Sequence, residues 1–266
     1  MMRKLLKYDL RANIKLFLFI WPAMLVVAGL QRLLLSLQVE GFPGKFLVGL
    51  LTVLMLFTMV AVVVLCFILC VIRFYSGLLR REGYLMFTLP VKPWQLLTSK
   101  FLAAMLTLIQ TFILAYFGIA LILSGTTDGV WHTMFNFSQI MDQKLNALTL
   151  TLAALTALAA LANMLLRVYF VSCLGHLFRR ARIFLSILFY YLIGILVQIV
   201  SMLALVRVTV GAEIPLLNAL CNWFTTLSFN ASLSVFLGCI LLANVAIGFV
   251  YFFVSEVLLR KRLNLD

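Results

Sequence analysis

Six apolar stretches, each of roughly 20 residues or more, constrain what this chain can fold into. They are continuous rather than alternating, which favours helices over barrel strands, because a backbone in lipid must satisfy its own polar groups. We therefore predict an all-α integral membrane protein with six transmembrane helices in a single transmembrane domain, residues 1–266. The predicted spans cover residues 16–37, 46–71, 101–123, 145–174, 183–206 and 231–259.

Composition supports the prediction of a membrane protein. Hydrophobic residues make up 65% of the chain and charged residues 11%, whereas a soluble domain has about 45–50% apolar and about 25% charged residues. One soluble core could not bury so much apolar surface. The chain is expected in a cell membrane as a multi-pass protein, most simply the bacterial cytoplasmic membrane.

The basic residues predict the orientation of the spans. With six spans, both termini and the second and fourth loops share one side, which holds all of the 21 basic residues except Arg32, Lys45, Lys144 and Arg207. The positive-inside rule places that side in the cytoplasm. The net charge of +13 thus reports topology and affinity for anionic headgroups, and nucleic acid is not an expected partner.

Residues 1–15 predict a short amphipathic helix at the cytoplasmic interface. Its basic side cluster comprises Lys4, Lys7, Arg11 and Lys15, and its apolar residues are Leu6, Leu10 and Ile14. Asp9 and Asn13 interrupt the apolar face. Two interpretations remain open: a helix lying among the headgroups, or a simple basic anchor for the first span.

The sequence contains no catalytic, metal or nucleotide motif, so the chain is not expected to be an enzyme. His132 and His176 fall on opposite sides of the membrane in the predicted topology. Cys66 and Cys70 share a helix face and are expected to behave as small apolar residues. We expect no metal and no cofactor-binding residues in this chain.

Four neutral polar residues are predicted near the middle of the spans, namely Gln110, Asn163, Gln198 and Asn244. Hydrogen bonds between neighbouring helices are the favoured interpretation. The alternative is that they line a pathway for a substrate.

The segment between the second and third spans is unusually long and polar. Pro90 must end any helix that begins near Glu82, whereas Pro93 suits the first turn of the next helix. We therefore predict a short helix at 83–89 with an apolar surface rimmed by charge, which is typical of a protein-binding surface. A helix that merely lies on the membrane is the alternative.

The stretch "REGYLMFTLPVKPWQLLTSKFL", residues 81–102, resembles the loop between the second and third spans of type-2 ABC transporter (ABC-2) permease subunits. The small peptide-export or antibiotic-immunity-like branch is the most similar in size. In that family the loop forms the coupling helix that contacts the ATPase. The resemblance implies ATPase contacts at Arg81, Glu82, Gly83, Tyr84, Leu85 and Phe87.

The same resemblance implies the partners. A separate ABC ATPase subunit, in two copies, would carry ATP and Mg, and a second permease copy or a paralogous permease would complete the assembly. The last external segment, 211–230, would hold short re-entrant helices.

The expected function is the permease subunit of an ATP-driven exporter for an amphipathic substrate, such as a peptide antibiotic, a drug or a lipid-like molecule. Two alternatives remain open at this point: a non-transporting membrane scaffold or assembly factor, and an uncoupled channel or carrier.

Overall fold

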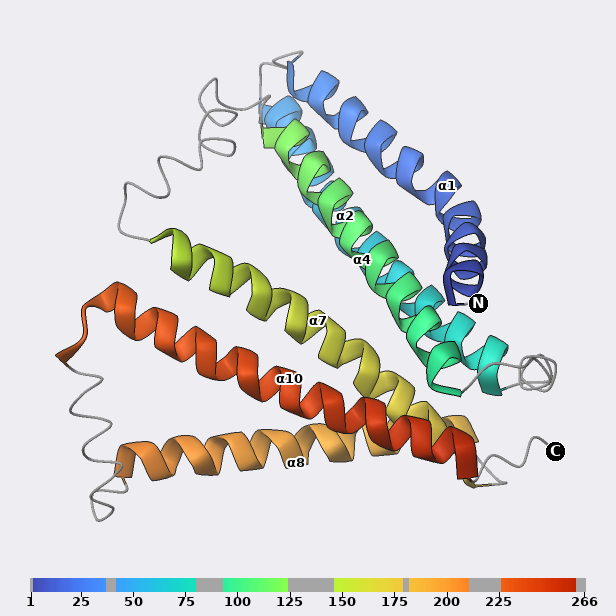
Figure 1. Cartoon of the computed structure of the whole chain (residues 1–266). Helices are drawn as coiled ribbons and strands as arrows, with labels where there is room; N and C mark the ends of the chain where they lie inside the picture. The colour runs from blue at the N-terminus through green and yellow to red at the C-terminus, as the bar shows by residue number, and fades with distance from the viewer. Residues whose placement is uncertain are drawn as a thin grey trace. The chain divides into compact units, whose positions relative to one another are not determined.

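The computed structural model describes residues 2–36, 42–79, 93–123, 146–178, 182–210 and 226–261, and nearly all of them are helical (Figure 1). The chain forms two compact units, Met1–Ile140 and Met141–Asp266. The elements of the first unit are α1 (Met2–Ser36), α2 (Phe42–Phe74), its π-helical continuation η1 (Tyr75–Leu79) and α4 (Pro93–Leu123). Those of the second are α7 (Ala147–Gly175), α8 (Arg182–Val210) and α10 (Phe229–Lys261).

Five of these helices are long and apolar enough to cross a membrane. A sixth candidate is α1, in which Arg3–Lys15 and Phe17–Leu33 are joined by a bend of 44°. The prediction of an all-helical, multi-pass membrane protein is confirmed at this level. The bend also lies at the predicted boundary between the interfacial helix and the first span, and it precedes Pro22, which stays inside α1.

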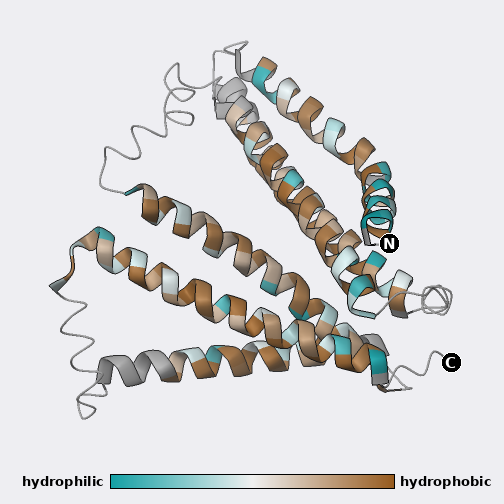
Figure 2. Cartoon of the chain, in the orientation of Figure 1, coloured by the Kyte–Doolittle hydropathy of each residue, from teal (hydrophilic) through white to brown (hydrophobic). Residues whose placement is uncertain are grey.

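The outer faces of both units are those of a protein solvated by lipid. Phe19, Phe57 and Phe249 expose 79%, 70% and 69% of their surfaces, which water would strongly disfavour for so many large apolar side chains. Figure 2 shows apolar residues along most of each helix, with hydrophilic residues gathered in the first turns of α1.

In the first unit, α1 and α2 both pack against α4. The indole of Trp21 donates a hydrogen bond to the Thr111 hydroxyl (3.1 Å), and the Cys66 sulfur lies 3.2 Å from the same oxygen. One threonine on α4 thus joins both neighbouring helices. Further along, a methionine-rich core formed by Met24, Ala28, Met55, Met59 and Ala115 fills the space between the three helices.

In the second unit, α7 packs against both α10 and α8. Phe170 and Tyr251 stack with their ring centroids 5.4 Å apart, joining α7 to α10. The buried face of α7 includes Leu165, Tyr169 and Cys173. By contrast, much of the apolar surface of α8 is exposed within this unit, including Leu192, Ile195, Leu196 and Ile199.

Candidate functional site

The predicted ATPase-contact residues, 81–85 and 87, lie outside the described residues. The structure describes the helices on either side: η1 ends at Leu79, and α4 begins at Pro93. The expected start of the third helix in its proline turn is therefore confirmed. On both sides of this segment, α2 and α4 contact the first half of α1.

Asp9 holds the start of α4. One carboxylate oxygen of Asp9 lies 3.5 Å from the Lys100 ammonium nitrogen, and the other accepts a hydrogen bond from the Ser99 hydroxyl (3.0 Å). The Asp9 and Lys100 side chains are only 14% and 11% exposed. Because both are largely removed from water, each depends on the other for its charge to be compensated.

Arg73 holds the end of α2 to the same stretch of α1. Its guanidinium donates hydrogen bonds to the Asn13 side-chain oxygen and to the carbonyl oxygen of Ala12. Asn13 is 5% exposed, so this contact is buried. Asp9 and Asn13 lie one turn apart on α1, which lets one helix face bind both neighbours.

Gly77 in η1 makes room for the ion pair. A Cβ atom at this position would lie 2.7 Å from the Lys100 nitrogen and 3.3 Å from its Cε atom. The lysine side chain therefore lies directly against the η1 backbone on its way to Asp9. We define the clamp as Asp9, Asn13, Arg73, Gly77, Ser99 and Lys100.

Sequence reasoning missed the clamp. In the sequence, Asp9 and Asn13 only interrupt an apolar face, and the sequence does not indicate Lys100 as a partner of either. The structure instead pairs Lys100 with Asp9. The available signal was the single carboxylate in a strongly basic segment, since an isolated acid there needs a cationic partner to be buried.

The structure unites two of the four polar residues predicted near the middle of the spans. The Asn163 amide nitrogen donates to the Asn244 side-chain oxygen (3.0 Å) and to the Asn244 carbonyl oxygen (3.1 Å), joining α7 to α10. Gln110 on α4 and Gln198 on α8 are exposed, each on the surface of its own unit. The four residues thus do not form one cluster within either unit.

Arg167 lies deeper in its helix than a simple end residue, because α7 continues for about two turns beyond it. Its guanidinium donates to the Tyr190 carbonyl oxygen (2.6 Å) and stacks 4.3 Å from the Tyr190 ring centroid. At Gly194, one turn further along α8, a Cβ atom would lie 2.0 Å from the guanidinium. This notch between α7 and α8 was not foreseen from the sequence.

Within the described residues, no three His, Cys, Asp or Glu side chains are grouped so that they could hold a metal ion. No family model, curated protein or solved structure matches this chain. The features that bear on function are therefore the motif, the helix arrangement and the clamp.

Proposed function

We propose that this chain is the permease subunit of an ATP-driven exporter, working with a separate ABC ATPase and with a second permease copy or a paralogous permease. The motif at 81–102 supports this proposal through its resemblance to ABC-2 permeases. The number of apolar helices and the concentration of basic residues on one side agree with that layout.

The observation that carries the proposal is the position of the clamp. The end of α2, just before η1, and the first turns of α4 are tied to α1 by Asp9, Asn13, Arg73 and Lys100. A push on 82–87 by the ATPase would reach α2 and α4 together and be transmitted to α1 as one movement. A rigid body of this kind is what a two-state switch requires, because shifts at a contact site are amplified only by packed elements.

The placement of carboxylates also favours an ATP-driven mechanism over an ion-coupled carrier. Ion-coupled carriers normally place ionisable groups within the membrane along the ion path. The acidic residues of this chain lie near the ends of the predicted spans or in the connections, and Glu256 lies in the last turns of α10. The energy source is then expected on a partner.

The proposal is tested by co-expressing this chain with a candidate ABC ATPase, purifying through this chain, and measuring ATPase recovery and hydrolysis. Glu82→Arg or Tyr84→Ala should release the ATPase or uncouple its hydrolysis, because loss of a desolvated charge or an aromatic hot spot typically costs over about 2 kcal/mol of binding. Lys92→Ala is the matched control and should bind normally.

Two results would redirect the assignment. Full ATPase association and transport in both Glu82→Arg and Tyr84→Ala would end the coupling-helix interpretation. Substrate flux through vesicles that contain this chain alone would favour the uncoupled channel or carrier.

A further inference from the structure

The first half of α1 presents a basic stripe. Arg3, Lys7, Arg11 and Lys15 recur at every fourth position, which places successive members about one turn apart and rotates the stripe only slowly around the helix. All four side chains are exposed. Among the described acidic residues, the one carried by this segment is Asp9, and it is engaged by Lys100 and Ser99.

The clamp fixes which way this stripe faces. Asp9 and Asn13 hold one side of the helix against α4 and α2. At about 100° per residue, the stripe lies on a different side from these two contacts. Turning the basic residues inwards would therefore break both the ion pair and the Arg73 contact.

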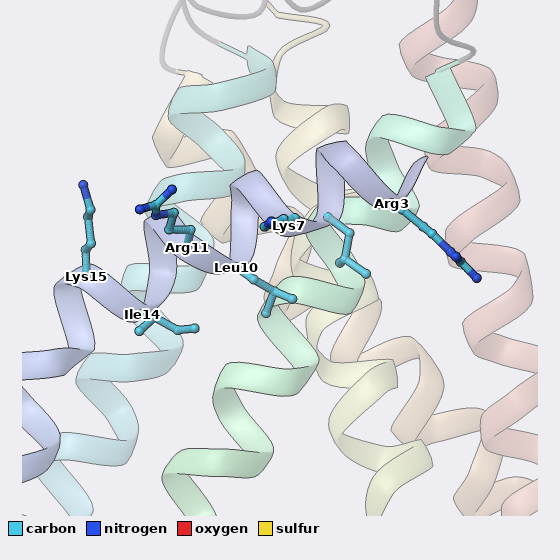
Figure 3. A pocket seen from close by; sticks show the side chains of 7 residues that line it. Arg3, Lys7, Leu10, Arg11, Ile14 and Lys15 are labelled. Carbon is cyan, nitrogen blue, oxygen red and sulfur yellow. The ribbon is translucent and has the colours of Figure 1, made fainter. Parts of the chain in front are cut away.

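An apolar edge runs beside the basic stripe. Leu6, Leu10 and Ile14 line an open hollow of about 720 Å³ together with the four basic residues. Figure 3 shows Arg11 and Lys15 pointing to one side of the helix, and Leu10 and Ile14 pointing to the other. A hollow that brings cationic and aliphatic side chains together matches an amphiphile that carries a negative headgroup.

We propose that this surface, formed by Arg3, Lys7, Arg11 and Lys15 with Leu6, Leu10 and Ile14, binds anionic phospholipid. The lipid phosphate would contact the guanidinium and ammonium groups, and the upper part of an acyl chain would lie along the aliphatic edge. Cationic side chains over an apolar face are the arrangement by which interfacial helices bind anionic membranes.

The connection of the stripe to the apolar half of α1 favours lipid, rather than an acidic protein, as the ligand. The apolar half of α1 begins at Phe17, immediately after the bend, so Arg11 and Lys15 lie within two turns of the segment that enters the hydrocarbon. That distance places the stripe at the depth of the headgroups. The inference does not depend on the proposed exporter function.

The test uses the full chain, purified in a neutral detergent and titrated with phosphatidylglycerol or phosphatidylcholine, with bound lipid counted by native mass spectrometry. Wild type should retain phosphatidylglycerol preferentially. The triple variant Lys7→Gln/Arg11→Gln/Lys15→Gln should lose most of that preference, since each removed charge is expected to weaken it by about fivefold. Arg260→Gln, which removes an exposed charge from α10, is the control and should keep the preference.

A second measurement requires no variant. Raising the salt concentration to about 0.5 M should abolish the preference of wild type, because exposed charges are then screened over a few ångströms. Equal retention of the two lipids by wild type at low salt would overturn the proposal. Undiminished phosphatidylglycerol retention in the triple variant would also overturn it, and loss of ATPase binding in that variant would then assign the stripe to an acidic protein surface.

Discussion

The ammonium nitrogen of Lys100 lies 3.5 Å from the carboxylate of Asp9 and directly against the backbone of Gly77. Three elements, α1, η1 and α4, therefore meet at one side chain. Because Arg73 joins α2 to the next turn of α1, α2 and α4 are both held to α1.

Replacing Lys100 with Met should lower the free energy of unfolding by about 3–5 kcal/mol, the usual cost of removing one partner of a buried ion pair. Asp9 would then keep Ser99 as a partner but lose its counter-charge. Denaturation of the detergent-solubilised chain measures the loss, and the double variant with Asp9→Asn should be much less than additive. Lys4→Gln is the control, because Lys4 is an exposed residue of α1, the helix that carries Asp9. Its free energy of unfolding should stay within about 0.5 kcal/mol of wild type. Strict additivity would contradict a direct pair.

Gly77→Ala should destabilise the chain although alanine favours helices. The new Cβ atom would lie 2.7 Å from the Lys100 nitrogen, so the lysine side chain must shift. We expect this shift to weaken the contact with Asp9 by more than the helix propensity gain of roughly 1 kcal/mol. Gly29→Ala, at a position with no atom within 4 Å of the new Cβ, should show that gain alone. In a Lys100→Met background, Gly77→Ala should no longer lower the free energy of unfolding. An equal loss of stability in both backgrounds would show that the clash with Lys100 is not the cause.

The spans were predictable because lipid imposes one simple requirement, a long apolar helix. Their ends were predictable where chemistry marks them: Pro93 opens α4, and the last lysine before the apolar half of α1, Lys15, marks the bend. Helical periodicity likewise gave the basic and apolar sides of residues 1–15. These features are local, so a single segment of sequence contains the information.

The contacts between helices were not predictable, because periodicity gives the faces of a helix but not its neighbour. Asp9 and Asn13 find partners far along the chain, at Lys100 and Arg73. The sequence likewise does not give Arg167 its partner, since a guanidinium within a few turns of a helix end can reach headgroups or a neighbouring helix equally well. The predicted ATPase contact at 81–87 lies outside the described residues and stays a prediction.

Asn163→Leu and Asn244→Leu should each lower stability by roughly 0.6–1.7 kcal/mol, the range for polar contacts between membrane helices. The double variant should lose little more, because both changes remove the same pair of hydrogen bonds. Gln110→Leu and Gln198→Leu, at exposed positions, should leave thermal stability unchanged. Loss of substrate-stimulated ATP hydrolysis in either glutamine variant, with normal stability, would instead favour a pathway lining at that residue.

Single cysteines introduced into a cysteine-free background test the predicted orientation. Positions Lys144 and Glu213 should react with a membrane-impermeant maleimide applied from outside the cell, because the positive-inside rule places them there. Positions Arg80 and Arg180 should react only after the membrane is opened. Labelling of all four positions from one side would end the six-span topology.

The Arg167 notch supplies the last prediction. Gly194→Ala would place a Cβ atom 2.0 Å from the guanidinium, which must then give up its hydrogen bond to the Tyr190 carbonyl and its position over the Tyr190 ring. The hydrogen bond is worth about 1.5–3 kcal/mol and the cation–π contact about 0.5–2 kcal/mol, so the loss should exceed any gain in helix propensity. Thermal denaturation of the full chain measures it.

Gly238→Ala in α10, where the new Cβ would meet no atom within 4 Å, is the matched control and should be neutral or slightly stabilising. Arg167→Lys should not replace the arginine, because a compact ammonium cannot stack on the ring and bond the carbonyl with the geometry of a planar guanidinium. An Arg167→Leu background has no guanidinium for the new Cβ atom to meet. Gly194→Ala should therefore lower stability much less there than in wild type. A Gly194→Ala variant as stable as Gly238→Ala would show that Arg167 does not join α7 to α8, and the arginine would then be assigned to the lipid headgroups.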